Sequence, residues 1–446
     1  MITELIGDIT RSVGLPALKH VAGIVTRRLP IPQPTLLVGP GSSARLGQAV
    51  SGFGHRKILI VTDAGISRLG LMTPLTQALR EGGTDFVVFD QIAPDAPIAL
   101  IEKGIACLRA EGCDAIVAIG GGSPIDAAKA IGLSVANDKH PRQLVGYFKG
   151  WHGPLPIYAV PTTAGTGSEV TVAAVISDPA NHAKLVIADT RIVPRMAALD
   201  PCLMTGLPGP VTAATGMDAL THAIEAYLGY WSTDLSDRMA LSAVGMIFEN
   251  LPVAFATGND LVAREKMALA STYAGLAFTR ANVGNVHAIA HQLGGLYHTP
   301  HGLANAILLP HVLRFCAPAV GAKLAALAVA AKAGAPGEPE AVLARKFLAA
   351  VEAMSQTLGI PRQLDALREN DIPALAEAAC WEADTNYPVA CRMTQQDCRE
   401  LLRQALPPRR APKRTTRRKP ARTQRAPSRA SPAPSARAAR PPRPAG

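Results

Sequence analysis

The sequence predicts an α/β domain built on a parallel sheet, followed by an all-α helical domain. Between residues 34 and 205, short apolar strands alternate with helical stretches, and after Asp200-Pro201 long helical runs follow without a convincing strand. Short buried strands separated by helices are typical of a parallel sheet that helices cover on both faces. With 446 residues, of which 48% are hydrophobic, the chain can bury the cores that two such domains need.

Four strands and four helices are the most clearly marked elements. The strands are short apolar runs that end at polar or glycine-rich turns. The helices carry apolar residues at helical spacing. The predicted strands are Lys57–Thr62, Phe86–Phe89, Ala115–Ile119 and Ile157–Val160, and the predicted helices include Val211–Leu228, Leu235–Leu251, Leu261–Thr279 and Val286–Gly294.

Changes in composition divide the chain into four segments. In the N-terminal extension, apolar residues recur at helical spacing before Pro30-Ile31-Pro32, which predicts a packed or peripheral helix, or one in weak membrane contact. Beyond Pro407 the chain consists mainly of Pro, Arg, Ala, Ser and Thr, without one aromatic residue, so we expect a disordered tail. The segments are the extension 1–33, the α/β domain 34–205, the helical domain 206–406 and the tail 407–446.

The charge distribution limits the classes of partner. Residues 407–446 hold 13 of the 45 Lys and Arg residues and no Asp or Glu, so 32 basic residues stand against 34 acidic ones in the rest of the chain. Because the net charge of residues 1–406 is close to zero, it gives no argument for nucleic-acid binding by the folded part of the chain. Contact with polyanions is therefore expected of the tail alone.

The cysteines and the apolar runs predict the compartment. The seven cysteines are an odd number, widely scattered and without a C-x-x-C pair, which argues against a disulfide framework and against a zinc knuckle. No apolar run reaches the roughly 18–20 residues of a membrane span, and the N-terminus begins with acidic residues rather than with a basic region followed by an apolar one. We expect a cytoplasmic protein.

A glycine-rich turn follows the third predicted strand. Gly120-Gly121-Gly122 allows close backbone approach, and Ser123, Pro124 and Asp126 have the pattern of a helix N-cap, a first-turn proline and an N3 carboxylate. The free amides of such a helix start would hold a diphosphate. The turn lacks the standard G-x-G-x-x-G fingerprint, since Ile125 stands at the third glycine position, and an ordinary tight turn is an equally good interpretation.

Two further polar sites follow predicted strands. Asp63 closes the first strand, where a carboxylate can accept hydrogen bonds from ribose hydroxyls and repel a 2′-phosphate, which favours NAD over NADP. A plain helix N-cap explains Asp63 equally well. The loop Pro161–Glu169 offers Thr162, Thr163 and Thr166 with two glycines, a density that suits ligand contact, although turns made of such residues are common.

Histidines cluster in the helical domain. Asp218 and His222 are four residues apart and share one face of a helix, and His287 and His291 repeat that spacing. Five of the 11 histidines fall between His287 and His311. Buried imidazoles without partners are costly, so such a cluster in an apolar region suits a divalent metal. One carboxylate with imidazoles suits Fe(II) or Zn(II), and affinity alone favours zinc. We expect Gly294-Gly295 to end the helix that carries His287. His298 would then be either exposed or next to the metal ligands without binding the metal itself.

Four motifs together resemble the iron-containing, or group III, alcohol dehydrogenase family. They are Gly120–Asp126, Pro161–Glu169, Asp218–His222 and His287–His301, and they occur in the order and spacing of the family over about residues 34–406. The resemblance implies the architecture shared with dehydroquinate synthase, with the active site between a nucleotide-binding domain and a helical domain. It also implies an NAD- and iron-dependent dehydrogenase that acts on small alcohols or aldehydes and forms a homo-oligomer, a dimer or larger.

The resemblance also implies roles for individual residues. It places the metal on Asp218, His222, His287 and His301, with zinc as the alternative ion to iron. His291 becomes the non-ligand histidine beside the nicotinamide, and we expect it to relay a proton. The predicted cofactor residues are Asp63, Gly120, Gly121, Gly122, Ser123, Asp126, Thr162, Thr163, Thr166 and Lys184.

Rival functions stay open at this point. A maleylacetate-type reductase and a glycerol-type polyol dehydrogenase lie within the same class, although the latter normally uses fewer histidines. A dehydroquinate-synthase-like lyase shares the fold, NAD and a metal, but it needs a basic anchor for a substrate phosphate, and the metal helices carry few Lys or Arg residues. A non-enzymatic nucleic-acid binder rests on the tail only.

Overall fold

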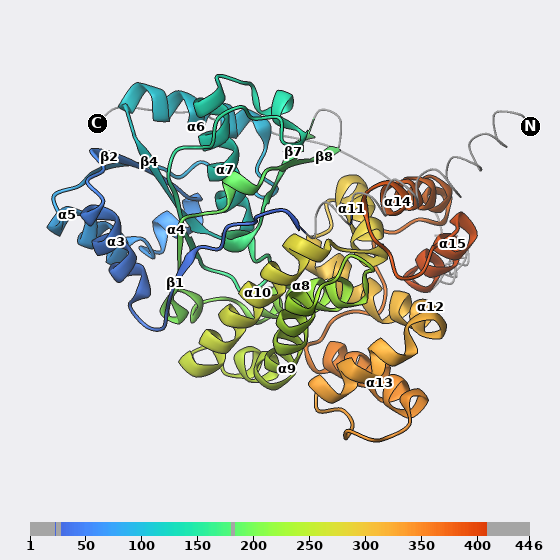
Figure 1. The fold of residues 1–446 in the computed structure, drawn as a ribbon. Coiled ribbons are helices and arrows are strands. Elements are labelled where there is room, and N and C mark those ends of the chain that lie inside the picture. The colour runs from blue at the N-terminus through green and yellow to red at the C-terminus, as the bar shows by residue number, and fades with distance from the viewer. Residues whose placement is uncertain (1–22, 24–27, 180–182, 408–446) are drawn as a thin grey trace, which may run out of the picture. The chain divides into compact units, whose positions relative to one another are not determined.

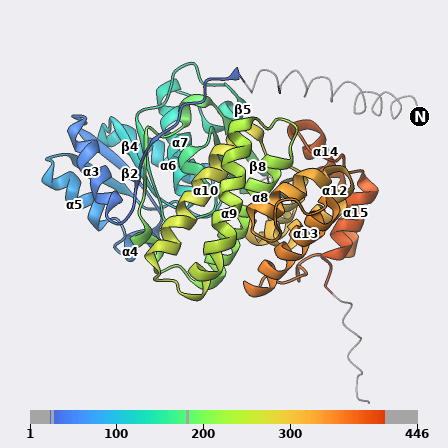
Figure 2. The same ribbon diagram turned by 60° about the horizontal axis from the view of Figure 1, so that its bottom comes forward.

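The computed structural model describes residue 23, residues 28–179 and residues 183–407. Within them an α/β part is followed by a helical part, as Figures 1 and 2 show. This confirms the predicted fold class. Nearly all of the N-terminal extension and residues 408–446 of the tail lie outside the described residues, so the helix expected in the one and the disorder expected in the other stay predictions. The boundary between the two domains at residues 205–206 also stays a prediction.

Six parallel strands form the main sheet, in the order β1-β9-β6-β4-β2-β3. All four predicted strands are present in it as β2, β3, β4 and β6. The sequence did not reveal β1 or β9, nor the second sheet, β5-β8-β7, in which β7 and β8 are antiparallel. The strands are β1 Thr35–Val38, β2 Lys57–Val61, β3 Asp85–Phe89, β4 Ala115–Gly120, β5 Gly146–Tyr147, β6 Ile157–Pro161, β7 Ala173–Asp178, β8 Ala183–Ala188 and β9 Met196–Leu199.

Helices cover both faces of the main sheet, because alternate strand residues point to opposite sides and both sides are apolar. Ile58 and Ile60 of β2 pack against α3 and α5, whereas Leu59 and Val61 pack against α6 and α7 (Figure 1). The helices of this part are α3 Ser42–Gly52, α4 Ala64–Arg68, α5 Thr73–Glu81, α6 Ile98–Glu111 and α7 Gly122–Asn137.

The helical part has its own apolar core, in which α8 packs against α9, α10 and α12 (Figure 2). The four predicted helices are confirmed as α8 to α11, each with slightly wider bounds. The helices are α8 Gly209–Leu228, α9 Asp234–Ala256, α10 Leu261–Ala281, α11 Asn285–Tyr297, α12 His301–Ala330, α13 Glu340–Thr357, α14 Ile372–Asn386 and α15 Gln395–Gln404. Short 3-10 helices are η2 Pro141–Leu144, η3 Ser168–Val170, η5 Thr190–Ile192, η6 Pro201–Met204 and η7 Glu369–Asp371.

Two of these helices, α9 and α12, are long and apolar enough to cross a membrane by length and composition alone. The core helices of soluble proteins pass the same test. Here α12 contributes Leu308, Leu309 and Leu324 to the apolar core that it shares with α8, and both helices carry charged residues such as Asp237 and Lys323. Their apolar character is therefore explained by packing within the helical part.

Helix α11 corrects one expectation about its end. It continues through Gly294-Gly295 to Tyr297, and His298 caps it in the left-handed conformation with φ of 54°. The tight packing of α11 against α12 and α14 outweighs the weak helix preference of the two glycines. His298 is nevertheless exposed, as expected from the sequence.

Candidate metal centre and nucleotide loops

Four side chains from three helices meet in the helical part. Asp218 and His222 come from α8, His287 from α11 and His301 from the first residue of α12. One ligand atom from each lies within 4.8 Å of the others, and this is the one group of three or more His, Cys, Asp and Glu side chains that meets the test for a metal site among the described residues. The structure therefore brings together all four residues that the resemblance assigned to the metal.

Local packing fixes how closely the helices approach. His301 follows Thr299-Pro300, and its neighbour Gly302 packs so tightly on α8 that an added Cβ would lie 2.4 Å from the Ala214 carbonyl oxygen. The same Cβ would lie 3.3 Å from Cβ of Asp218. Glycine at this position therefore lets the start of α12 touch α8 and brings His301 next to Asp218, whose Oδ1 lies 3.6 Å from the His301 Nε2.

His222 is held by stacking. Its ring lies 4.3 Å from that of Phe278 and 4.6 Å from that of His287, in near-parallel planes. Its Nδ1 is buried and has no hydrogen-bond partner among the described residues. Buried imidazole nitrogens without partners are the sites that a metal ion satisfies.

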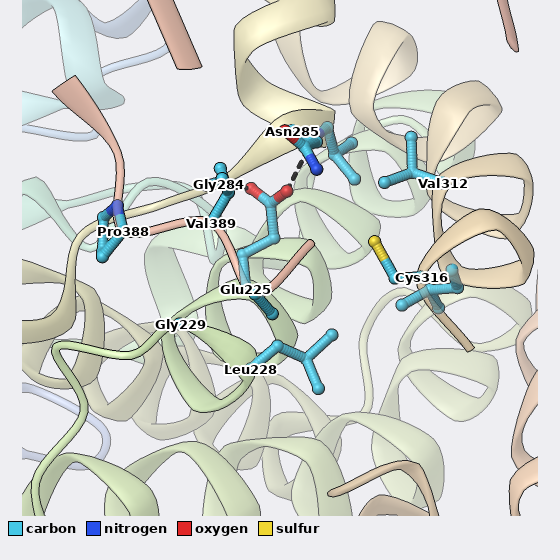
Figure 3. Close-up of a pocket in the computed structure, with 12 residues that line it drawn as sticks. Glu225, Leu228, Gly229, Gly284, Asn285, Val312, Cys316, Pro388 and Val389 are labelled. Atoms are coloured by element: carbon cyan, nitrogen blue, oxygen red, sulfur yellow. Dashed lines mark hydrogen bonds between the residues drawn. The ribbon is translucent and has the colours of Figure 1, made fainter. Parts of the chain in front are cut away.

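Glu225, one turn after His222 on α8, orients His287. Its Oε2 lies 2.6 Å from the His287 Nδ1 and accepts the Gly284 N–H at 2.8 Å, while its Oε1 accepts the Val286 N–H at 2.6 Å. Figure 3 shows this carboxylate turned toward the start of α11, in the wall of a cavity of about 20 Å³. A carboxylate that accepts at Nδ1 leaves the lone pair of the ligand on Nε2.

Asn305 marks the point on which the ligand atoms converge. Its amide nitrogen donates to Oδ1 of Asp218 at 2.7 Å and lies 3.1 Å from Nε2 of His287 and 3.2 Å from Nε2 of His301. One carboxylate oxygen and two ring nitrogens therefore lie within 3.2 Å of a single nitrogen atom, so three of the four candidate ligands surround one point. That is the arrangement that a cation requires.

Burial and charge give these groups the protonation states of metal ligands. Burial lowers the pKa of His287 and of His301 well below the ordinary value, so both imidazoles are neutral at pH 7. Burial alone would raise the pKa of Asp218, but His222, His301 and His287 together hold it below its usual value. One carboxylate and three imidazoles fit a divalent ion such as Fe(II) or Zn(II).

His291 lies beside this group without belonging to it. Its ring stacks on that of His301 at 5.2 Å. On its other side, Nδ1 lies 2.6 Å from Oε1 of Glu382 on α14, and the same oxygen accepts the Tyr387 hydroxyl at 2.5 Å. The second carboxylate oxygen accepts the Gln292 amide at 2.7 Å. His291 is thus next to the metal ligands and is fixed from the opposite side.

Apart from Lys184 on β8 and Asp126 inside α7, the predicted nucleotide residues lie at one edge of the main sheet. The strands β2, β4 and β6 are adjacent and parallel, so the loops that follow them emerge at the same edge. The glycine turn touches the threonine loop, since a Cβ added at Gly121 would lie 3.5 Å from Oγ1 of Thr163, and one at Gly122 would lie 2.8 Å from the Thr166 methyl. In open α/β sheets, nucleotides bind at this edge.

The helix start at the glycine turn differs from the prediction. Helix α7 begins at Gly122 and its N-cap is Gly121, so Ser123 is not the N-cap and Asp126 is not at N3. The glycines adopt the cap conformation without a side-chain acceptor, and Gly120 has φ of 148°. The Ser123 hydroxyl instead accepts the Asp95 N–H at 3.0 Å.

Asp126 is engaged by the protein itself. Its carboxylate accepts from the Ser168 hydroxyl at 2.5 Å and from the Val175 N–H at 3.0 Å, and Lys129 lies 4.0 Å away. Burial lowers the pKa of Lys129 to about 8 despite the neighbouring carboxylates. These contacts give Asp126 a structural role in supporting the threonine loop, and its contact with a cofactor stays a prediction.

Asp63 and Lys184 have partners in the protein as well. Asp63 caps α4, and its Oδ1 accepts the N–H groups of Gly65 and Ile66 at 2.8 and 3.0 Å. Lys184 on β8 donates to Asp95 at 2.9 Å, and its Nζ lies 3.6 Å from the Cβ position of Gly294 on α11. Lys184 therefore stands where the nucleotide loops face the metal helices.

Sequence reasoning missed Glu225, Asn305 and Glu382. Glu225 follows His222 by three residues and Asn305 follows His301 by four, and both spacings place two side chains on one helix face, as for Asp218 and His222. That spacing was a usable signal. Glu382 offered none, because its partner His291 lies 91 residues away on another helix.

Comparisons with known proteins agree with this geometry. The model of the iron-containing alcohol dehydrogenases matches residues 33–201, and the model of the C-terminal part of that family matches residues 212–406. The chain is 41% identical over 372 residues to the 1,3-propanediol dehydrogenase of Klebsiella pneumoniae, covering 82% of this chain and 96% of that protein. It is 39% identical over 377 residues to the NAD-dependent methanol dehydrogenase of Bacillus methanolicus, covering 84% and 98%.

Solved structures give the same result. The crystal structure of a 1,3-propanediol oxidoreductase superposes with a TM-score of 0.81 at 40% identity, covering 84% of this chain and 98% of that one. The resemblance seen in the four motifs is thereby confirmed, together with the prediction of an NAD- and metal-dependent oxidoreductase acting on alcohols or aldehydes. The chain belongs to the iron-containing alcohol dehydrogenase family.

Proposed function

We propose that this enzyme interconverts small primary alcohols and their aldehydes at an Fe(II) ion held by Asp218, His222, His287 and His301. The observation that carries the proposal is the convergence of these four side chains within 4.8 Å. The names of the similar propanediol, methanol and lactaldehyde enzymes support a short, uncharged substrate. Zinc is the alternative ion, since it binds such ligands more tightly than iron.

Two residues outside the proposed ligand set, Glu225 and His291, have separate roles in the proposed reaction. A metal held by these four residues would supply Lewis-acid polarisation of the substrate oxygen, and bound NAD(H) would supply or accept the hydride. Glu225 keeps the His287 lone pair available at Nε2 through the 2.6 Å contact at Nδ1. His291, which lies beside the ligands, carries the proton between the substrate oxygen and water.

The nucleotide is proposed to lie along the edge of the main sheet. Backbone amides at Gly121, Gly122 and Ser123 hold its diphosphate at the start of α7, a helix of 16 residues. Thr162, Thr163 and Thr166 supply hydroxyls from the adjoining loop. Asp63 binds a ribose, and Lys184, whose Nζ lies 3.6 Å from the Cβ position of Gly294, lies near a cofactor ribose.

Metal removal tests the proposal directly. Protein stripped of metal is expected to lose its activity, and anaerobic addition of Fe(II) or Zn(II) is expected to restore it. Activity is then measured over a panel of small primary alcohols and aldehydes with NAD and with NADP. Full dehydrogenase activity in metal-free protein would overturn both the mechanism and the ligand assignment.

The role of His291 has its own test. His291→Ala is expected to keep its metal, because His291 is not among the four converging residues, and to turn over far more slowly. Full turnover by His291→Ala with metal bound would exclude the proton-carrying role.

We further propose a cellular location and an assembly state. The seven cysteines are all free in the structure, which suits a reducing, cytoplasmic compartment. We also propose a homo-oligomer and salt-sensitive contact of the basic tail with polyanions. Light scattering tests the first, and filter binding of the full chain against a chain ending at Leu406 tests the second.

A further inference from the structure

We propose that Glu382 is a positioning residue for His291, holding it in the tautomer that carries its proton on Nδ1 and leaves Nε2 as the acceptor. The inference rests on the proposed role of His291 as proton carrier. It concerns a residue on α14, far in sequence from the four motifs that identify the family.

The contact between the two side chains selects the tautomer. Oε1 of Glu382 lies 2.6 Å from Nδ1 of His291. An ionised carboxylate can only accept hydrogen bonds, so Nδ1 must donate and therefore carries the proton. In a neutral imidazole with a protonated Nδ1, the other ring nitrogen holds the free lone pair. Nε2 is thus set as the atom that can accept a proton.

Two further donors fix the carboxylate. The Tyr387 hydroxyl donates to Oε1 at 2.5 Å, and the Gln292 amide donates to Oε2 at 2.7 Å. Both carboxylate oxygens are therefore engaged and the group has one orientation. Tyr387 is buried, with 8% of its surface exposed, and burial next to Glu382 raises its pKa well above the ordinary value, so it stays a donor at all working pH values.

The arrangement also fixes the plane of the ring. His291 is confined between the carboxylate and the ring of His301, which lies 5.2 Å away with an angle of 18° between the two planes. His301 is held in turn at the start of α12. The hydrogen bond to Glu382 on one side and the stacked ring of His301 on the other leave the His291 imidazole little freedom to rotate.

Glu382→Gln tests the inference in zinc-loaded holoenzyme. The amide keeps the shape of the side chain, but it can donate as well as accept, so it no longer selects one tautomer. We expect kcat to fall on the order of tenfold to a hundredfold, with metal content, melting temperature and KM for alcohol and for NAD within about twofold of the wild type. Tyr387→Phe removes one of the fixing donors and is expected to lower kcat less, by about threefold to tenfold.

Two comparisons separate positioning from a purely structural role. Glu377→Gln, an exposed position on the same helix, is the matched control and is expected to leave every parameter unchanged. Nitrogen-15 spectra of His-labelled protein report the tautomer directly: Nε2 of His291 is expected to be unprotonated in the wild type and to exchange between two forms in Glu382→Gln.

The outcomes distinguish this inference from the function on which it rests. A slow His291→Ala with a fully active Glu382→Gln would overturn the positioning role and leave the proton carrier in place. A fully active His291→Ala would remove both. Loss of metal or of folding in Glu382→Gln and Tyr387→Phe alike, without a change of tautomer, would show that the cluster is structural and would also reject the inference.

Discussion

Glu225 and His287 are joined by a 2.6 Å contact between the carboxylate Oε2 and Nδ1 of the imidazole, in a place where both side chains are buried. The same carboxylate accepts the N–H groups of Gly284 and Val286 at the start of α11. One side chain on α8 therefore sets both the position of the helix that carries His287 and the nitrogen that His287 presents to the metal.

Replacing this carboxylate is expected to weaken the metal site. Glu225→Gln keeps the volume of the side chain but loses the charge-assisted bond, so we expect the affinity for Zn(II) to fall on the order of tenfold to a hundredfold. Competition with a chromogenic chelator measures it. Unchanged affinity would show that the backbone of α11 alone places His287.

Glu225 also predicts a pH dependence in metal-free protein. Burial raises the pKa of Glu225 to about 7, above its unfolded value, so the native state takes up a proton as pH falls through about 7 while the unfolded state does not. The wild type should therefore gain stability relative to Glu225→Gln by up to about 1.4 kcal/mol per pH unit between about pH 6.5 and 5. Urea unfolding of both proteins across this range measures the difference. A difference that is constant with pH would contradict the assignment.

Removing one metal ligand is expected to separate the two halves of the site. His287→Ala should lose most of the bound metal and nearly all turnover, because the proposed ion would be held jointly by side chains of α8, α11 and α12. Binding of NAD should remain largely intact, since its loops follow strands of the other part of the chain. Elemental analysis and NAD titration report the two properties, and equal loss of both would argue against separate sites.

Asp63 predicts the choice of nucleotide. A 2′-phosphate beside this carboxylate suffers repulsion between like charges, so the wild type should prefer NAD strongly and Asp63→Gly should use NADP better. The ratio of kcat/KM for the two nucleotides tests it. Because Asp63 also caps α4 through Gly65 and Ile66, and glycine is itself a tolerated N-cap residue, the variant is expected to lose only about 0.3 kcal/mol of stability. Equal use of both nucleotides by the wild type would reject the assignment.

The basic tail is expected to be dispensable for catalysis. Residues 408–446 lie outside the described residues, and the composition of the tail, with no aromatic side chain, offers nothing to bury. A chain ending at Leu406 should keep more than about half of the activity under steady-state assay. A larger loss would mean that the tail supports the enzyme.

The sequence by itself determined the features that lie within one element. Asp218 and His222 are one helical turn apart, so a helix necessarily places them on one face, and Gly120–Gly122 after a buried strand necessarily forms a turn at the sheet edge. The resemblance then united these segments, and the structure brings all four proposed ligands together.

The exact helix boundaries and the contacts between different helices were decided only by the tertiary structure. The N-cap of α7 is Gly121 rather than the predicted Ser123, and α11 extends past Gly294. Packing against neighbouring loops and helices outweighs the intrinsic helix preferences of single residues, which amount to about 1 kcal/mol at most for glycine. The contacts of Glu225 with His287 and of Glu382 with His291 span 62 and 91 residues. Spacing along the chain carries no information about such distances, since they depend on how the packed helices are placed relative to one another.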